Sequence, residues 1–182
     1  TVLSRGLGDV YKRQRQICEK LAKIKISKDI PLVICSKGIE EKSFYLLSQV
    51  VSEILPNDVA ILSGPNFAIE VAKNLPTCTT IACENKTTGM FILENLASEY
   101  FRPYYSDDIV GAQISGAVKN VLAIACGIAY GRQFGENAKA ALVTRGMAEI
   151  TRLNKVLGGK DETLIGLSGI CLLYTSDAAD ES

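Results

Sequence analysis

The first part of the chain alternates short, continuous apolar runs with amphipathic segments. The apolar runs predict buried strands at 32–35, 59–62, 78–83 and 101–105. The segments between them have helical spacing and predict helices at 15–26, 41–54, 67–74 and 87–98. Strands that are apolar along their whole length and alternate with helices are typical of a parallel sheet covered on both faces. The sequence therefore predicts an α/β fold for this part.

From residue 107 the pattern changes. Asp107 and Asp108 precede a segment, 109–130, that is apolar on nearly every face and rich in glycine, alanine and serine. A helix that is apolar all round belongs in a core. Further helices are predicted from Glu136 to about Leu153 and from Asp161. Residues 107–170 are therefore expected to form an all-helical domain.

Composition narrows the class of protein. Twenty basic and 20 acidic residues give a formal net charge of zero, so nothing points to a nucleic-acid partner. The six cysteines lack CxxC spacing, and without histidine to share a metal they are interpreted as buried free thiols in a reducing compartment. No uninterrupted apolar run reaches the length of a membrane span, and residues 1–14 lack the apolar core of a signal peptide. A soluble, cytoplasmic protein is expected.

The absence of histidine draws attention to two lysines. Proton transfer near neutral pH would have to use lysine, a carboxylate, tyrosine or cysteine. Lys37 follows the apolar run at 32–35, and Lys119 interrupts the helix of small residues. Helical spacing puts Lys119 on one face with Ala112, Ser115, Gly116, Leu122 and Cys126. The pattern suggests cations held in a cleft for an anionic substrate. Taken singly, each lysine fits an alternative at least as well: Lys37 can cover a sheet edge, and Lys119 can reach out to solvent or pair with a carboxylate.

A second candidate follows the strand predicted at 59–62. This strand runs directly into Ser63-Gly64-Pro65-Asn66 and then a helix, at the sheet edge where α/β folds bind ligands. Gly64 allows close backbone approach, and Asn66 offers polar contacts. A plain strand-to-helix turn is the alternative. Farther along, the i, i+4 spacing of Arg145 and Glu149 predicts a structural ion pair.

Several motifs in sequence order resemble those of the bacterial-type NAD(P)-dependent glycerol-3-phosphate dehydrogenases. They cover about residues 15–170 and are Cys35-Ser36-Lys37-Gly38-Ile39-Glu40, Leu62-Ser63-Gly64-Pro65-Asn66-Phe67-Ala68, Leu75-Pro76-Thr77, Gly116-Ala117-Val118-Lys119-Asn120-Val121, Gly135-Glu136-Asn137-Ala138 and Ala140-Ala141-Leu142-Val143-Thr144-Arg145-Gly146. The resemblance implies the C-terminal part of a Rossmann-like parallel sheet over 15–106, followed by the start of the helical substrate domain over 107–170, with the site between them.

The resemblance also implies residue roles. Lys119 is similar to the general acid/base at the carbonyl of dihydroxyacetone phosphate, and Lys37 to the lysine that contacts substrate and cofactor. Gly64 and Asn66 match substrate-contacting positions, although family members usually carry Ser or Thr where Asn66 stands, and Ala68 matches a contact to the cofactor, NAD or NADP. The implied reaction interconverts dihydroxyacetone phosphate and sn-glycerol 3-phosphate for glycerophospholipid synthesis, in the cytoplasm, with a possible homodimer and no nucleic-acid or membrane partner.

The two ends of the chain depart from the family pattern. Residues 1–14 and 171–182 look like translated sequencing-adapter tails, so they are expected to pack poorly. The family's glycine-rich nucleotide loop should precede residue 15, and its phosphate-binding Arg-Asn pair should follow Ile170; neither is in place. The chain as written is therefore expected to be inactive. The alternatives are another Rossmann-plus-helical dehydrogenase, such as a ketopantoate-reductase-like enzyme, and a non-catalytic fragment.

Overall fold

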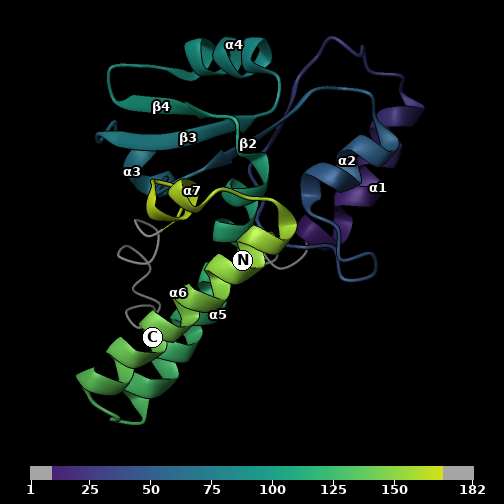
Figure 1. Ribbon diagram of the computed structural model, residues 1–182. Coiled ribbons are helices and arrows are strands. Elements are labelled where there is room, and N and C mark those ends of the chain that lie inside the picture. The colour runs from purple at the N-terminus through teal and green to yellow at the C-terminus, as the bar shows by residue number, and fades with distance from the viewer. Residues whose placement is uncertain (1–9, 170–182) are drawn as a thin grey trace.

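The computed structural model describes residues 10–169, and its centre is a single four-stranded sheet (Figure 1). In spatial order the strands are β1 (Leu32–Ile34), β2 (Val59–Ser63), β3 (Thr77–Cys83) and β4 (Phe101–Ser106). β1 pairs with β2 and β3 pairs with β4 in parallel, as predicted. All four strands lie where the apolar runs predicted them, to within a residue or two.

The pairing of β2 with β3 is antiparallel, so the prediction of a fully parallel sheet is wrong at this one position. The connection between the two strands has no long crossover helix of the kind that usually joins parallel strands. Its only helix, α3 (Ala68–Ala72), has five residues and is about 7 Å long, whereas a five-residue strand spans about 17 Å. Such a helix cannot carry the chain back to the starting edge of the sheet, and β3 returns beside β2 in the opposite direction.

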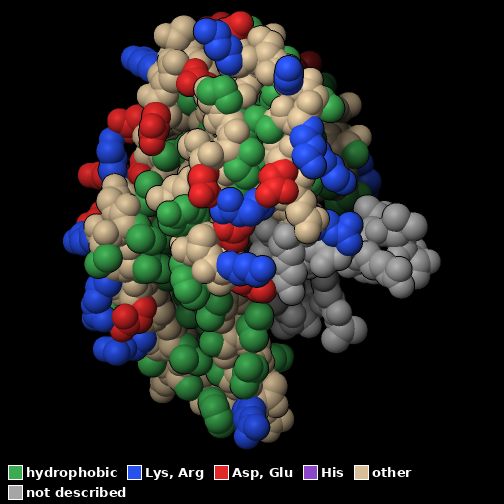
Figure 2. All heavy atoms as spheres, turned by 90° about the vertical axis from the view of Figure 1, so that its right-hand side faces the viewer, with side chains coloured by type: hydrophobic (Ala, Val, Ile, Leu, Met, Phe, Trp, Pro, Cys, Tyr) green, Lys and Arg blue, Asp and Glu red, His purple; other side chains and the backbone are tan. Residues whose placement is uncertain are grey.

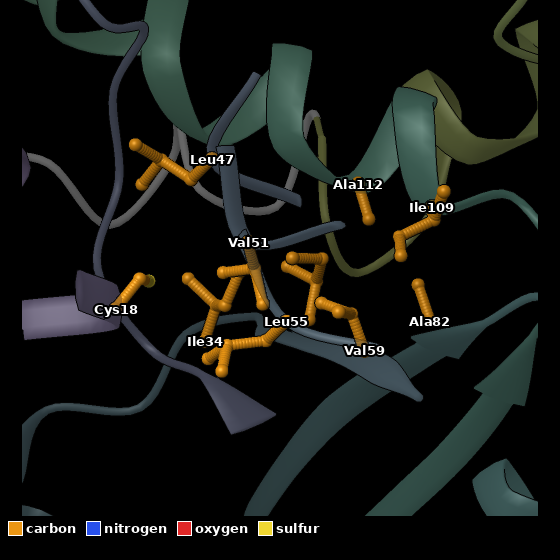
Figure 3. Packing of buried hydrophobic residues seen from close by; sticks show 10 residues of the cluster. Cys18, Ile34, Leu47, Val51, Leu55, Val59, Ala82, Ile109 and Ala112 are labelled. Atoms are coloured by element: carbon orange, nitrogen blue, oxygen red, sulfur yellow. The ribbon is translucent and has the colours of Figure 1, made fainter. Parts of the chain in front are cut away.

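Helices cover both faces of the sheet, as predicted. On one face the side chains of Val59 and Ile61 pack into a core with α1 (Val10–Lys23), α2 (Leu47–Ile54) and the first turns of the long helix described below. Figure 3 shows this core, with Val51 and Leu55 close to Ile34 and Val59. On the other face Ala60 and Ile81 pack against Ile92 of α4 (Lys86–Leu96). Alternate residues of β2 thus face opposite cores.

α2 begins at Leu47, six residues later than the helix predicted from residue 41. The preceding residues form a turn instead. The backbone N–H of Glu40 donates to the carbonyl of Tyr45 at 2.9 Å, and Phe44 has a φ of 58° and an 80% exposed side chain. An aromatic residue in the left-handed region interrupts a right-handed helix. The apolar spacing at 41–46 therefore reflects loop residues and not a buried helical face.

The helical part starts directly after the sheet. α5 (Ile109–Gly131) and α6 (Glu136–Leu157) form a long antiparallel hairpin that extends away from the strands, and α7 (Asp161–Ile165) returns toward the start of α5 (Figure 1). Asp108 is the N-cap of α5, since its carboxylate accepts the Gly111 N–H at 2.8 Å. The same carboxylate accepts the Lys160 N–H and the Thr163 hydroxyl. One buried side chain thus joins the sheet end, α5 and α7.

The outer end of the hairpin carries exposed apolar side chains. Figure 2 shows hydrophobic atoms gathered over this lower part of the molecule. The most exposed there are Val121, Ile124, Ile128, Tyr130 and Phe134. By length and composition α5 could also cross a membrane, which the expectation from uninterrupted apolar runs does not include. The first third of α5 is nevertheless a core helix, because residues 109–116 are largely buried.

The N-terminal helix begins earlier than predicted, at Val10 and not at residue 15. Gln14, the last residue of the segment expected to pack poorly, is buried and contacts the body of the protein. It accepts a hydrogen bond from the Ser36 hydroxyl at 3.1 Å and donates to the Leu47 carbonyl at 3.4 Å. The expectation of poor packing is therefore wrong at Gln14. Residues 1–9 and 170–182 lie outside the described residues.

Candidate active site

The structure brings the two predicted lysines together. Lys37 lies in the loop after β1, and its side chain runs along the α5 backbone at Gly116. A Cβ atom added at Gly116 would lie 3.4 Å from both Cγ and Cδ of Lys37. Gly116 and Lys119 are one turn apart on α5, so the Lys37 ammonium group reaches Lys119. The glycine at this position leaves the space in which the lysine side chain lies.

The surroundings of Lys119 lower the pKa of its ammonium group to about 8, well below the usual value for lysine. Burial of the half-exposed side chain is the larger cause, because it disfavours the charged form. The positive charge and hydrogen bond of Lys37 act in the same direction. A lysine with this pKa is protonated at neutral pH and can still release its proton, which suits a general acid/base.

The predicted turn after β2, Ser63-Gly64-Pro65-Asn66, is tightly packed and is called the corner below. Gly64 is buried, and a Cβ atom added to it would lie 2.9 Å from both Cα and Oγ1 of Thr79 on β3. It would also lie 3.0 Å from Oδ1 of Asn66. Backbone atoms of two strands approach so closely here that only glycine fits.

Two polar atoms in this corner have no hydrogen-bond partner among the described residues. They are Oγ of Ser63, whose residue is 2% exposed, and Oδ1 of Asn66. Buried polar atoms normally have a partner, so these two are suited to bind a ligand or water. Asn66 was predicted to be a site residue; Ser63 was not, and its apolar neighbours on β2 gave no separate signal. Ala68 begins α3, and its side chain is exposed.

Strand register relates the lysines to this corner. Ile34 on β1 pairs with Ile61 on β2, and Lys37 and Gly64 each lie three residues farther along. Because β1 and β2 are parallel, both positions are at the same edge of the sheet. α5, which carries Lys119, packs against β2. The predicted residues Lys37, Lys119, Gly64 and Asn66 thus come from elements that meet at one sheet edge.

These residues suit part of a nicotinamide dinucleotide site. Lys37 follows β1 and Ala68 follows the turn after β2, and this turn offers unpartnered polar atoms. Residues 10–169 contain no G-x-G-x-x-G turn between a strand and a helix, which is the feature that holds a pyrophosphate. The Gly6-Leu7-Gly8-Asp9 segment lies outside the described residues. Within the described part of the chain, no cluster of three or more metal-binding side chains occurs.

Sequence reasoning missed the contacts that hold the Lys37 loop. Glu40 was noted only as part of a motif, yet its carboxylate receives two hydrogen bonds from Arg15 on α1, both 2.8 Å long. Arg15 and Glu40 are far apart in the sequence, and no spacing rule connects them. The predicted pair of Arg145 and Glu149 is present, with 3.5 Å between Nη2 and Oε1.

Comparison with known protein families finds the same family in both parts of the chain. The family model described as NAD-dependent glycerol-3-phosphate dehydrogenase N-terminus matches residues 11–89. The corresponding C-terminus model matches residues 108–182. The gap between the two matches contains α4 after its first turns and β4.

Curated relatives agree with these models. A glycerol-3-phosphate dehydrogenase [NAD(P)+] of Paramagnetospirillum magneticum is 54% identical over 154 residues, which are 84% of this chain and 56% of the relative. The enzyme of the same name from Parvibaculum lavamentivorans is 50% identical over 157 residues, 86% of this chain and 47% of the relative. The chain thus spans about half the length of the relatives it matches.

Solved structures show the same fold. A glycerol-3-phosphate dehydrogenase of Coxiella burnetii has a TM-score of 0.83 and 39% identity, and the match covers 91% of this chain and 51% of that one. One from Saccharomyces cerevisiae has a TM-score of 0.81 and 30% identity, with 92% and 51% covered. The alternative of a ketopantoate-reductase-like protein is not favoured by these matches. The chain belongs to the NAD(P)-dependent glycerol-3-phosphate dehydrogenase family.

Proposed function

We propose that this chain carries the substrate-side half of the active site of a glycerol-3-phosphate dehydrogenase. The complete enzyme interconverts dihydroxyacetone phosphate and sn-glycerol 3-phosphate with NAD or NADP. The observation that carries the proposal is the pairing of Lys37 with Lys119 at the sheet edge, in a chain of this family. Two cations beside a corner with unpartnered polar atoms suit a small phosphorylated ketone.

Lys119 is the proposed general acid/base. When bound, the nicotinamide cofactor supplies a hydride to C2 of the ketone, or accepts one from C2 of the alcohol. During reduction the Lys119 ammonium group donates its proton to the C2 oxygen, and during oxidation the neutral amine takes it back. The pKa of about 8 leaves both protonation states accessible near neutral pH. Lys37 adds a second positive charge that stabilises the developing alkoxide.

The other predicted residues bind and orient in this proposal. Gly64 contacts the substrate in this proposal, and Asn66 accepts a hydrogen bond from a substrate hydroxyl through its unpartnered Oδ1. Lys37 contacts both substrate and cofactor, and Ala68 contacts the cofactor. Asn66 replaces the Ser or Thr that is usual in the family, and its amide has the acceptor oxygen that this role needs.

The proposal also covers the domains, cellular location and partners of the complete enzyme. In this proposal residues 15–106 belong to the partial Rossmann-like domain and residues 107–170 to the partial substrate domain. The complete enzyme works in the cytoplasm, supplies glycerophospholipid synthesis and has no nucleic-acid or membrane partner. The exposed apolar side chains of the α5–α6 hairpin support packing against a further surface, as a homodimer would provide.

Substrate protection of Lys119 tests this proposal on the chain as it exists. Trace acetylation of lysines, followed by peptide mass spectrometry, reports the reactivity of each amine with and without dihydroxyacetone phosphate. We expect the substrate to slow the labelling of Lys119 and Lys37. Lys139, exposed on α6 with one long contact to Glu136, is the internal control. Unchanged labelling of both site lysines at millimolar substrate, where Lys139 is also unchanged, would contradict the assignment of the site.

A further inference from the structure

The loop that carries Lys37 is a tight structure with its own fixed contacts. Gly38 has a φ of 141°, and Ile39 forms an isolated antiparallel bridge with Leu46. The Glu40 N–H donates to the Tyr45 carbonyl, and the Phe44 N–H donates to the Glu40 carbonyl, both at 2.9 Å. Glu40 therefore lies where the loop closes on itself, three residues after Lys37.

Arg15 binds this closing point from a different element. Its Nε and Nη2 atoms donate to the two carboxylate oxygens of Glu40, each at 2.8 Å, in the paired geometry that makes arginine–carboxylate contacts strong. Nη2 of Arg15 also lies 2.8 Å from Oε2 of Glu53 on α2. The Glu40 side chain is 15% exposed, and the Ser43 hydroxyl donates to the same carboxylate. Arg15 thus connects α1, α2 and the loop.

The Arg15–Glu40 contact, called the clamp below, opposes the repulsion between the two lysines. Two ammonium groups held close together repel each other, and this repulsion favours loop conformations in which Lys37 moves away from α5. We propose that Arg15 and Glu40 are positioning residues, which hold the loop so that the Lys37 side chain stays against Gly116 and beside Lys119. Neither residue touches the substrate in this account. The inference rests on the proposed function, because Lys37 and Lys119 are the groups that it positions.

The pKa values of Glu40 and Lys119 agree with this role of the Arg15–Glu40 contact. The Arg15 guanidinium, followed by the Ser43 hydroxyl, holds the pKa of Glu40 at about 2. The carboxylate is therefore fully ionised over the whole range in which Lys119 titrates, and the clamp keeps its strength there. Lys37 supplies both electrostatic contributions to the lowered pKa of Lys119, so displacement of Lys37 changes a measurable property of Lys119.

The test measures the titration midpoint of Lys119 in the full 182-residue chain by trace acetylation across pH 6–11. Glu40→Gln weakens the contact to the loop and leaves the Arg15–Glu53 contact between α1 and α2 in place. Glu53→Gln is the matched control, since it makes the same chemical change at the other partner of Arg15. Lys37→Met removes the neighbouring charge directly, so it gives the largest change in the Lys119 midpoint that displacement of Lys37 can cause. Circular dichroism and thermal melting verify that each variant is folded.

We expect Lys37→Met to raise the Lys119 midpoint by about one pH unit. Glu40→Gln is expected to produce at least half of that shift, and Glu53→Gln less than a quarter of it. If Glu40→Gln leaves the midpoint as in the parent while Lys37→Met raises it, the clamp does not position Lys37, and the inference is wrong. If Lys37→Met also has no effect, the pairing of the two lysines is itself wrong, and the proposed function loses its main support.

If Glu40→Gln does not fold, Arg15→Lys provides the second test. Lysine keeps the positive charge but cannot make the paired hydrogen bonds. A folded Arg15→Lys chain is expected to show an intermediate Lys119 midpoint and faster amide exchange at residues 38–45. Parent-like values for both measurements would overturn the inference.

Discussion

At the scale of single residues, the site depends on one lysine with an unusual environment and on one glycine with no room beside it. The chain has no histidine, so a general acid/base near neutral pH would be another group whose pKa the fold has moved. Lys119 is such a group, because half-burial and a neighbouring cation both act against its charge. Gly64 allows the close packing of β2 and β3 because it has no side chain, and any side chain there would contact Thr79.

Replacement of Lys119 by alanine tests the proposed chemistry. In a chimera that joins residues 15–170 to the remaining segments of the Paramagnetospirillum magneticum relative, Lys119→Ala should lower kcat about 10²–10⁴-fold, because it removes the proton donor. Lys119→Arg should restore little, since arginine does not release its proton near neutral pH. Lys139→Ala is the control. A kcat within a few-fold of the parent for Lys119→Ala would make Lys119 a structural lysine.

The lowered pKa of Lys119 also predicts a pH dependence of stability. Between about pH 8 and the unfolded value near 10.5, the unfolded chain binds more protons at this residue than the folded chain. The free energy of unfolding of the parent should therefore rise over this range relative to that of Lys119→Met, and the difference should be constant below pH 7. Urea unfolding of both proteins at pH 7, 8, 9 and 10 measures it. A constant difference throughout would mean that the pKa is not lowered.

Addition of one methyl group at Gly64 should be costly. Because the new Cβ of Gly64→Ala would lie 2.9 Å from the backbone Cα of Thr79, β2 and β3 would have to move apart. The expected loss of unfolding free energy is roughly 1–3 kcal/mol. Gly127→Ala is the matched control, because Gly127 lies inside α5 with open space beside it and should gain about 1 kcal/mol. Equal melting temperatures for the two variants would contradict the packing described here.

At the scale of elements, the start of α5 connects the sheet to the helical part. Ile109 and Ala112 belong to the same core as β2 and α2, while Ile114 and Leu122 belong to the core shared with α6 and α7. One helix thus contributes to both cores and also carries Lys119. Asp108 holds its first turn and, through Lys160 and Thr163, the return of the chain at α7.

Loss of the Asp108 carboxylate should therefore affect more than one element. Asp108→Ala removes the N-cap of α5 and leaves two donors near α7 without their acceptor, so we expect a loss of about 2–4 kcal/mol. Asp107→Ala is the control. Asp107 is exposed and pairs only with the Lys160 ammonium group in the described contacts, so its loss should cost less than about 1 kcal/mol. Comparable losses for both would assign no special role to Asp108.

Elements with a strong local signal could be predicted from the sequence, and those that depend on distant contacts could not. The apolar runs that became β2 and β3 and the long apolar segment around Lys119 are strong local signals in the sequence. The direction of β3 depends on the length of the preceding connection, and the start of α2 depends on a turn closed by Glu40. The lysine pair could be inferred because both residues interrupt apolar patterns. The Arg15–Glu40 contact joins two ordinary charged residues, and only the fold brings them together.

At the scale of the whole molecule, the described residues bring the candidate lysines and the Gly64 turn to one sheet edge, and they do not include a glycine-rich nucleotide turn. The parts of the site that belong to residues 10–169 lie where β1, β2 and α5 meet. The glycine-rich turn that holds the pyrophosphate of a dinucleotide is not among these residues.

The 182-residue chain alone is therefore expected to show no reduction of dihydroxyacetone phosphate with NADH or NADPH. Without a pyrophosphate site among residues 10–169, little binding energy remains to place the nicotinamide against the substrate. The absorbance of the reduced cofactor at high protein concentration measures turnover, and the chimera is the positive control. Turnover by the chain alone would show that a working nucleotide site is present.

The position of β1 at the end of the sheet affects how the purified chain should be handled. Within residues 10–169 this strand pairs only with β2, and Val33 on it is partly exposed. An unpaired strand edge can recruit strands from other molecules, which is a common route to aggregation. Here the edge is only three residues long, so few backbone hydrogen bonds can form with a recruited strand. Because the edge is short, the purified chain should aggregate little through it during storage at high concentration. A proline in place of Val33 would block pairing at this edge further.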